Sequence, residues 1–270
     1  GVALYLWHRY CGNERQVDGE GDAMRGALLG PAFGDDEIER FLQSRGVQFK
    51  TLSEKDRPEH AARLIAGGNV VGWFQGRMEF GPRALGCRSI LADPRNPQMQ
   101  RKLNLKIKFR ESFRPFAPSV LHDHAGDYFA IDRESPYMLL TAAVREERRK
   151  AVASGQADLH GLDRLHVERS EIPAVTHVDY SARLQTVNRR HNPPYRALLE
   201  AFHRLTGCPV LINTSFNVRG EPIVCTPEDA YRCFLRTDMD YLVLGSYLLD
   251  KRDMPEAQCA AARQDVFAPD

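Results

Sequence analysis

Apolar positions along the chain follow helical spacing in four segments. These segments are residues 35–46, 57–68, 193–207 and 226–237. The longest apolar stripe, in 193–207, consists of Tyr195, Leu198, Leu199, Phe202 and Leu205. Asp35 or Asp36 and Thr226 stand at expected N-caps, and Gly46 and Gly207 stand where helices end. We therefore predict helices over these segments and a short helix over 96–107.

Continuous apolar runs alternate with these helices. They predict strands at 47–52, 69–74, 116–121, 135–144, 209–216 and 240–249, and a strand over 172–187 that breaks at 179–181. This alternation indicates an α/β fold with a substantial sheet. Residues 145–171 are charged and weakly periodic, which predicts a solvated excursion or, alternatively, a lid or contact surface. We expect the chain after Arg252 to be poorly ordered.

The composition narrows the class of protein. The 270 residues are 43% apolar, which is enough for one large or two modest domains. The formal net charge is only +1, so a polyanion must be held by a local cluster of basic residues. The sequence has no apolar run of membrane-spanning length, no signal peptide pattern and no C-x-x-C pair among its six cysteines. We expect a reduced, cytoplasmic protein and, because residue 1 is Gly, a fragment or processed chain.

Polar and basic clusters stand where the apolar runs end. In "GRMEFGPRALGCRS", which follows the run 69–74, Arg77, Arg83 and Arg88 surround a Gly-Pro turn. A second cluster contains Lys106, Lys108, Arg110 and Arg114, and a third contains Asn213, Ser215 and Asn217. A weaker fourth cluster contains His177, Asp179 and Arg183. Strand alternation predicts that Lys108 and Arg110 share one face, and the third cluster alternates in the same way.

This inventory of side chains suits a polyphosphate. Arginine offers a planar fork that matches phosphate, lysine offers a compact charge, and Ser and Asn add short neutral donors. The P-loop and dinucleotide-binding motifs are absent from the sequence, so the predicted phosphate site is of another kind.

Plainer interpretations exist for each cluster. Arginines near acidic residues often form surface ion pairs, and Glu79, Glu111 and Glu221 are available as partners. The "HDH" at 122–124 is either a metal site or, more simply, a solvated loop. Cys87 and Cys225 are either catalytic thiols or small buried side chains. Four separate clusters at strand-to-loop transitions favour a joint functional role over independent ion pairs.

Four segments resemble one known family. They are "GRMEFGPRALGCRSILADPR", "IKFRESFRPFAPSVL", "HVDYSARLQTV" and "NTSFNVRGEPIVCTPEDA", and they resemble the C-terminal domain of the NodU/CmcH/TobZ-type O-carbamoyltransferases. The resemblance covers residues 36–251 and implies a YrdC-like α/β fold, a twisted mixed sheet flanked by helices with a positively charged cavity. Residues 1–35 resemble the end of the preceding actin-like domain, and residues 252–270 are a tail.

The resemblance also implies a reaction. Such a domain forms carbamoyl adenylate from carbamoyl phosphate and ATP with Mg²⁺, for O-carbamoylation of a hydroxyl acceptor. The preceding domain in the family is iron-dependent and transfers the carbamoyl group. Since most of that domain lies outside this sequence, we expect full transfer to need the actin-like domain or a subunit that supplies it. The sequence identifies neither the acceptor nor ligands for a metal.

Site residues follow from the family's motifs. The K-x-R and S-x-N pairs correspond here to Lys108-Phe109-Arg110 and Ser215-Phe216-Asn217. The resemblance implies catalytic roles for Lys108, Arg114 and Arg183. It implies that ATP and carbamoyl phosphate are bound by Arg83, Lys108, Arg110, Arg114, Arg183, Asn213, Ser215 and Asn217, with Arg77, Arg88 and His177 as weaker candidates. We expect Arg83 to hold a phosphate, and Arg77 or Arg88 to tie the turn to neighbouring carboxylates.

Two other functions are compatible with the same residues. One is a non-catalytic YrdC-like module that binds a nucleotide or RNA, and the other is a scaffolding fragment with a vestigial pocket. RNA binding requires a broad basic face, and the near-zero net charge and clustered arginines disfavour it. The intact K-x-R and S-x-N pairs disfavour a vestigial pocket.

Overall fold

A mixed eight-stranded sheet forms the centre of the molecule. The computed structural model describes residues 1–16, 22, 24–151, 159 and 161–264. The strand order is β1-β10-β9-β2-β3-β8-β4-β7, in which β9 is parallel to β2, β7 is parallel to β4 and the other neighbours are antiparallel. Its strands are β1 (Lys50–Thr51), β2 (Val71–Phe74), β3 (Arg88–Ala92), β4 (Ala117–Leu121), β7 (Gln185–Val187), β8 (Val210–Ser215), β9 (Tyr241–Leu244) and β10 (Tyr247–Asp250). β5 (Thr141–Ala143) and β6 (Ser181–Arg183) form a separate antiparallel pair.

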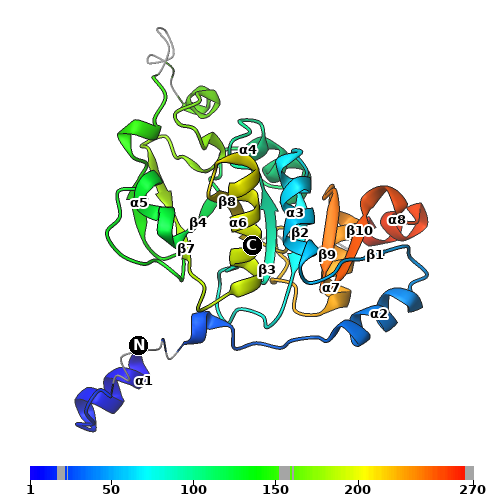
Figure 1. The fold of residues 1–270 in the computed structure, drawn as a ribbon, viewed down its shortest axis with the longest axis horizontal. Coiled ribbons are helices and arrows are strands. Elements are labelled where there is room, and N and C mark those ends of the chain that lie inside the picture. Colours follow the sequence, from blue (N-terminus) through cyan, green and yellow to red (C-terminus); the bar gives the residue numbers. More distant parts are fainter. Residues whose placement is uncertain (17–21, 23, 152–158, 160, 265–270) are drawn as a thin grey trace.

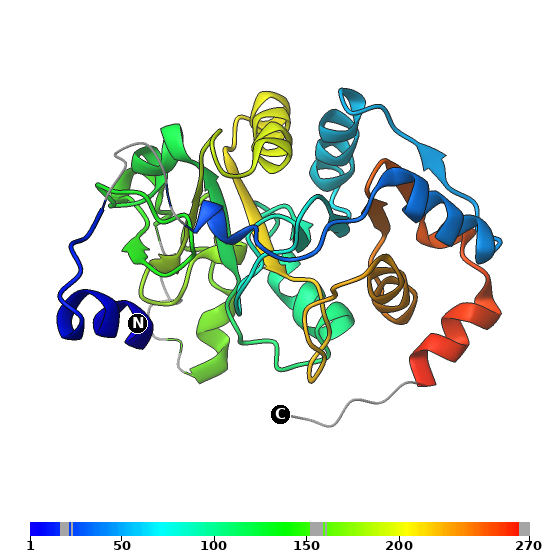
Figure 2. The same ribbon diagram turned by 90° about the horizontal axis from the view of Figure 1, so that it is seen from below.

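Helices cover both faces of this sheet. Figures 1 and 2 show α3 and α6 side by side on one face, with α7 on the other. The α-helices are α1 (Val2–Tyr5), α2 (Asp35–Ser44), α3 (Asp56–Ala66), α4 (Met99–Lys102), α5 (Ala125–Tyr128), α6 (Pro193–Thr206), α7 (Pro227–Arg236) and α8 (Glu256–Gln264). This arrangement confirms the predicted α/β fold with a large mixed sheet.

Helix α6 follows its sequence pattern closely. Asn192 caps the first turn by accepting a hydrogen bond from the Tyr195 amide, and Gly207 ends the helix with a left-handed φ of 73°. The predicted apolar stripe is buried against the sheet, except that Leu205 is 53% exposed. Leu205 lies in the last turn of the helix.

Helix α7 begins with a capping box. The Thr226 hydroxyl accepts a hydrogen bond from the Asp229 amide, and the Asp229 carboxylate accepts one from the Thr226 amide. Pro227 occupies the first turn, where its missing N–H costs no helical hydrogen bond. The helix places Phe234 and Cys233 in the core.

Replacing Thr226 with Ala is expected to lower the free energy of unfolding by about 1 kcal/mol, because the Asp229 amide in the first turn loses its side-chain acceptor. Denaturant unfolding at neutral pH measures this difference. Thr226→Ser keeps the hydroxyl and is the matched control. Equal losses in both variants would show that the methyl group, rather than the cap, carries the effect.

Two predicted strand assignments are corrected. Residues 240–249 do not form one strand, since Gly245 adopts a left-handed φ of 58° and turns the chain between β9 and β10. The strand β3 was not predicted, because Arg88 begins it and an arginine inside a fully buried strand contradicts the hydrophobic pattern. The predicted strand over 135–144 is reduced to β5.

The prediction of a poorly ordered tail is wrong for residues 256–264, which form α8. This helix packs against α7 and buries Cys259 and Ala262. Residues 265–270 lie outside the described part of the chain. In the charged region 145–171, the described residues include a bridge between Arg149 and Ser170. The rest of that prediction falls partly on residues 152–158 and 160, which are outside the described residues.

The N-terminal region has two parts. Helix α1 and a π-helical turn, Leu6–Tyr10, lie apart from the body at the lower left of Figure 1. Residues 25–33, which we call the N-terminal strap, instead run along the lower edge of the body towards α2. Among the described residues, no helix is long and apolar enough to cross a membrane.

Candidate functional site

A cavity of about 130 Å³ opens where several predicted clusters meet. It lies between the loop that joins β2 to β3, the start of β4, the end of β8, and β6. Its polar lining consists of Arg83, Arg110, Arg183, Asn213, Thr214 and Ser215, and its other lining residues are Pro82, Ala84, Pro115, Phe116, Ala117 and Met138. None of these lining residues is acidic. The cavity therefore gathers three guanidinium groups with no carboxylate among them, and we call it the arginine pocket.

The loop 76–88, which carries Arg83, is shaped by a buried carboxylate. One oxygen of Glu79 accepts hydrogen bonds from the amides of Leu85 (2.7 Å), Cys87 (2.6 Å) and Arg88 (3.2 Å). Glu79 therefore organises the loop backbone rather than pairing with an arginine. We refer to residues 76–88 as the arginine loop.

A glycine is required at one position of this loop. Gly86 has a φ of 101°, and a Cβ atom there would lie 2.1 Å from the ring of Tyr195. Its carbonyl accepts a hydrogen bond from the indole N–H of Trp73 at 3.0 Å. The loop therefore lies directly on the core side chains of β2 and α6, while Arg83 at its outer end is exposed.

Arg183 lies on β6 and points its charge at the same cavity. Its Nε is buried and has no hydrogen-bond partner among the described residues. Burial, and then the charge of Arg83, lower the pKa of Arg183. Two cations that repel each other across a cavity without a counter-charge are arranged to receive an anion.

Arg110 is the third guanidinium of the cavity lining. Its Nε donates to the side chain of Asn104 at 2.7 Å, and its guanidinium lies 4.9 Å from the ring centre of Phe116. Burial, and then the charge of Arg114, lower the pKa of Arg110 to about 10. Asn104 is buried and fixes the whole segment, because its amide also donates to the backbone oxygens of Ser112 and Arg114.

Lys108 does not share a face with Arg110, contrary to the strand alternation. Residues 103–107 form a π-helical turn and Phe109 has a φ of 48°, so the segment is not extended. The Lys108 side chain is buried beneath β8, where its ammonium donates to both the backbone and side-chain oxygens of Ser215 and Asn217. Burial lowers the pKa of Lys108 to about 7, whereas four acceptor oxygens favour the charged form. Lys108 thus holds the S-x-N turn instead of lining the cavity.

The residues of the third cluster, Asn213, Ser215 and Asn217, lie close together but make different contacts. Asn213 is buried and donates to Ala84 O, Ser119 Oγ and Gln185 Oε1, at 3.0–3.1 Å. Its own Oδ1 is buried without a partner among the described residues. Ser215 lines the cavity and donates to Asn217, which does not line it. Ser119 and Gln185 were missed by the sequence analysis because isolated polar residues within apolar strands carry no motif.

The remaining candidates lie outside the cavity. Arg114 forms an ion pair with Glu111 at 3.2 Å. Arg77 donates to the Leu29 carbonyl, and Arg88 is fully buried, donating to backbone carbonyls while its guanidinium stacks 3.6 Å from the ring centre of Phe74. Among the described residues, both guanidinium groups donate to backbone oxygens, and the link to a carboxylate is made by the Arg88 amide, which donates to Glu79 at 3.2 Å.

His177 lines a second cavity of about 180 Å³ beside the first. The two cavities share Pro115, and the charge of Arg183 contributes to the lowered pKa of His177, after burial. The apolar walls of the second cavity include Phe113 and Val178, and its polar lining includes Gln100 and Arg169. We call it the side cavity. Its mixed lining suits an uncharged heteroaromatic group.

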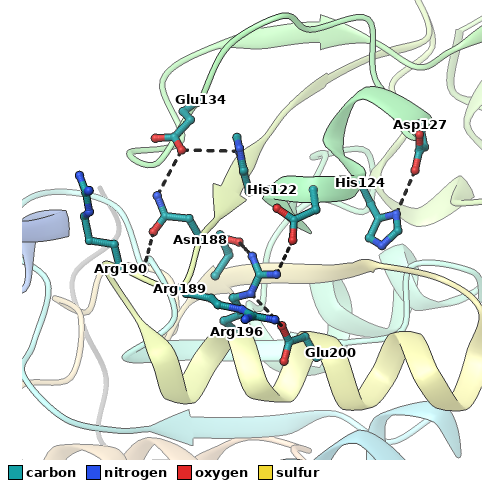
Figure 3. A network of polar contacts seen from close by, with 11 residues as sticks. His122, His124, Asp127, Glu134, Asn188, Arg189, Arg190, Arg196 and Glu200 are labelled. Atoms are coloured by element: carbon teal, nitrogen blue, oxygen red, sulfur yellow. Dashed lines mark hydrogen bonds and ion pairs between the residues drawn. The ribbon is translucent and has the colours of Figure 1, made fainter. Parts of the chain in front are cut away.

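The "HDH" segment belongs to a separate polar network, shown in Figure 3. Arg196 of α6 donates to Asp123 at 2.5 Å and to Glu200 at 2.9 Å, while His122 lies 3.7 Å from Glu134. Among the described residues, no group of three or more His, Cys, Asp or Glu side chains is placed to hold a metal ion. The network ties α6 to the β4–α5 connection, which favours the structural interpretation of this segment.

Several known proteins are similar in sequence to this chain. The family described as carbamoyltransferase C-terminus matches residues 62–251. The uncharacterized protein sll1178 of Synechocystis is 57% identical over 100% of this chain, which covers 44% of that protein. The 3'-hydroxymethylcephem-O-carbamoyltransferase of Amycolatopsis lactamdurans is 38% identical over 76% of this chain and 38% of the enzyme. A crystal structure of full-length HypF, in the phosphate- and nucleotide-bound form, has a TM-score of 0.46 at 16% identity, over 77% of this chain and 23% of that chain. The chain thus spans less than half the length of the curated relatives it matches.

Proposed function

The chain belongs to the carbamoyltransferase C-terminus family, and we propose that it forms carbamoyl adenylate from carbamoyl phosphate and ATP. The observation that carries the proposal is the arginine pocket, in which Arg83, Arg110 and Arg183 converge with no acidic lining residue. Both substrates present phosphate groups, and a guanidinium matches a phosphate with two parallel hydrogen bonds.

The proposed reaction proceeds in two steps. Water displaces phosphate from carbamoyl phosphate and leaves carbamate. A carbamate oxygen then attacks the α-phosphorus of ATP, a new P–O bond forms, and the bond to the β-phosphate oxygen breaks to release pyrophosphate. Charge accumulates on phosphoryl oxygens in both steps, so fixed cations lower both barriers. Neither step needs a side-chain nucleophile, which agrees with the burial of Cys87 and the raised pKa that burial gives its thiol.

Each wall of the pocket has a distinct task in this proposal. Arg83 and Arg183 bind the phosphate of carbamoyl phosphate, and Arg110 orients the α-phosphate of the nucleotide. The side cavity receives the nucleotide base, since it adjoins the arginine pocket at Pro115 and has apolar walls with a few polar groups. The arginine pocket has no carboxylate in its lining, and Glu168 of the side cavity is paired with Lys150 at 2.8 Å. In this proposal Mg²⁺ therefore enters as part of the nucleotide substrate, bound by phosphates and water.

Transfer to an acceptor is a further part of the proposal. The relative from Amycolatopsis lactamdurans is named for O-carbamoylation of a hydroxymethyl group, which supports a hydroxyl compound as the final acceptor. We propose that an actin-like, iron-dependent domain or subunit performs that transfer and that the reaction takes place in the cytoplasm.

Pyrophosphate release tests the half-reaction. The chain is incubated with ATP and Mg²⁺, with or without carbamoyl phosphate, and inorganic pyrophosphate is measured. We expect release only when carbamoyl phosphate is present. Inorganic phosphate in place of carbamoyl phosphate is the matched control and is expected to give none.

The other outcomes separate the alternatives. Release without carbamoyl phosphate would indicate a nucleotide hydrolase. Tight ATP binding without any release would refute turnover by this chain alone and favour a nucleotide-binding module. Competition of ATP by single-stranded RNA would favour the RNA-binding alternative.

A further inference from the structure

The N-terminal strap is hydrogen-bonded along the arginine loop. Three backbone bonds join them: Phe80 N to Ala27 O at 2.7 Å, Gly30 N to Met78 O at 2.9 Å, and Met78 N to Pro31 O at 2.9 Å. The strap lies outside the family match, which begins at residue 62. Figure 2 shows this segment crossing the body in front of the central strands.

Two arginine side chains strengthen this attachment. Arg77 donates to the Leu29 carbonyl at 3.0 Å, and Arg88 donates to the Pro31 carbonyl at 3.2 Å. Arg88 is fully buried, so its bond to the strap is shielded from water and from competing acceptors. Two arginines that the sequence suggested as anion ligands therefore fasten the strap to the loop.

Ala27 connects the strap to the pocket wall. Its side chain is 3% exposed and packs in a small apolar cluster with Leu85, Ala117 and Met138. Ala117 and Met138 also line the arginine pocket. Ala27 therefore packs in the same apolar cluster as two side chains of the pocket lining.

The turn at the start of the strap has an unfavourable backbone conformation. Arg25, Gly26 and Ala27 have successive φ values of 48°, 65° and 63°. The left-handed conformation is unfavourable for Arg25 and Ala27, which carry a Cβ. The Asp22 carboxylate accepts from the Gly26 amide at 3.1 Å and so helps to fix the turn. A strained turn that directs one carbonyl to Phe80 and one methyl group to the pocket wall is consistent with a positioning role.

We propose that the strap supports the anion site from outside its lining by positioning the arginine loop for phosphate binding. The Phe80 amide donates a hydrogen bond to the strap. Phe80 is followed directly by Gly81, Pro82 and Arg83, all of which are exposed. Fixing this end of the loop sets where the Arg83 guanidinium stands relative to Arg183. This positioning role rests on the proposed binding of phosphate in the arginine pocket. It makes that binding depend on strap residues that lie outside the pocket.

Gly30→Ala tests the proposal in the full chain. A Cβ at this position would lie 2.9 Å from both the Cβ and the backbone oxygen of Met78, so it would push the strap off the loop. Gly34→Ala is the matched control, since a Cβ there meets nothing within 4 Å and the φ of −79° suits alanine. Hydrogen exchange of the Phe80 amide reports the attachment of the strap, and calorimetry with inorganic pyrophosphate reports the anion site.

In Gly30→Ala we expect faster exchange at Phe80 and binding of pyrophosphate weakened by about tenfold or more. Gly34→Ala is expected to match the unaltered chain in both. Faster exchange with unchanged affinity would overturn the positioning role, and unchanged exchange would show that the strap does not hold the loop. If the unaltered chain itself fails to bind pyrophosphate, the proposed phosphate site fails with it. That outcome is distinct from one in which both proteins bind equally well.

Discussion

Replacing Arg183 with leucine is expected to weaken the binding of inorganic pyrophosphate about 100-fold, because a half-buried charge that would meet the anion directly is lost. The same substitution is expected to leave thermal stability unchanged or slightly higher. In the free protein, Arg183 has a buried Nε without a partner among the described residues and faces the charge of Arg83. Removing this cation relieves the repulsion from Arg83 and breaks no ion pair within the described part of the chain.

This combination separates a binding role from a structural one. An arginine that serves the fold lowers the melting temperature when it is removed, whereas a ligand-binding arginine lowers affinity alone. Arg189→Leu is the matched control, since it removes the same charge from an exposed side chain whose ion pair with Glu200 is long, at 3.4 Å. Calorimetry measures the affinity of both variants for pyrophosphate, and thermal unfolding measures their melting temperatures. A lower melting temperature with normal affinity in Arg183→Leu would contradict the site.

Arg183→Lys asks a narrower question. Lysine keeps the charge but lacks the planar fork of the guanidinium. We therefore expect its affinity for pyrophosphate to lie between that of the unaltered chain and that of Arg183→Leu. Full affinity in the lysine variant would mean that the pocket uses the charge at this position and not its geometry.

Replacing Lys108 with methionine is expected to lower the free energy of unfolding by about 3 kcal/mol, because buried oxygens lose their donor. The side chain is 3% exposed, and its ammonium is the donor to Ser215 and Asn217 in the S-x-N turn. Methionine has a similar length and supplies no hydrogen bond. Affinity for pyrophosphate is expected to fall as well, since Ser215 lines the arginine pocket.

Lys106→Met is the matched control for this variant. Lys106 lies two residues away in the same helical turn and is exposed, so its replacement is expected to change stability little. Denaturant unfolding compares the two. If Lys108→Met unfolds like the unaltered chain and yet loses all affinity, Lys108 is a direct ligand, as its motif position suggested, and not a support for the turn.

The sequence predicted the parts of the fold that depend on local pattern. Amphipathic α6, the Thr226 cap of α7 and the buried strand β8 all follow from spacing and cap residues. The hairpin of β9 and β10 was missed because its turn, Gly245-Ser246, lies inside one continuous apolar run. Local pattern does not distinguish a single strand from two when the turn is so short.

The residues of the candidate site were predicted only in part, because local pattern does not show which distant segments meet. Arg83, Arg110, Arg183 and Ser215 do meet at one cavity, as clusters at strand-to-loop transitions suggested. Arg77, Arg88 and Lys108 carry the same charge but point at backbone oxygens. Charge alone does not tell whether a basic side chain faces a ligand or a carbonyl, because that depends on contacts between distant segments.

The arginine pocket is assembled from segments that lie far apart in the chain. Its wall is supported from residue 27, and its lining extends from Pro82 to Ser215, through loops that meet only when β3, β4, β6 and β8 are all in place. Contacts of such long range form late in folding, because loop closure must precede them. A partly folded chain therefore has no anion site to offer. Binding is coupled to the complete native state, and an anion at 100 times its dissociation constant stabilises that state by about 2.7 kcal/mol.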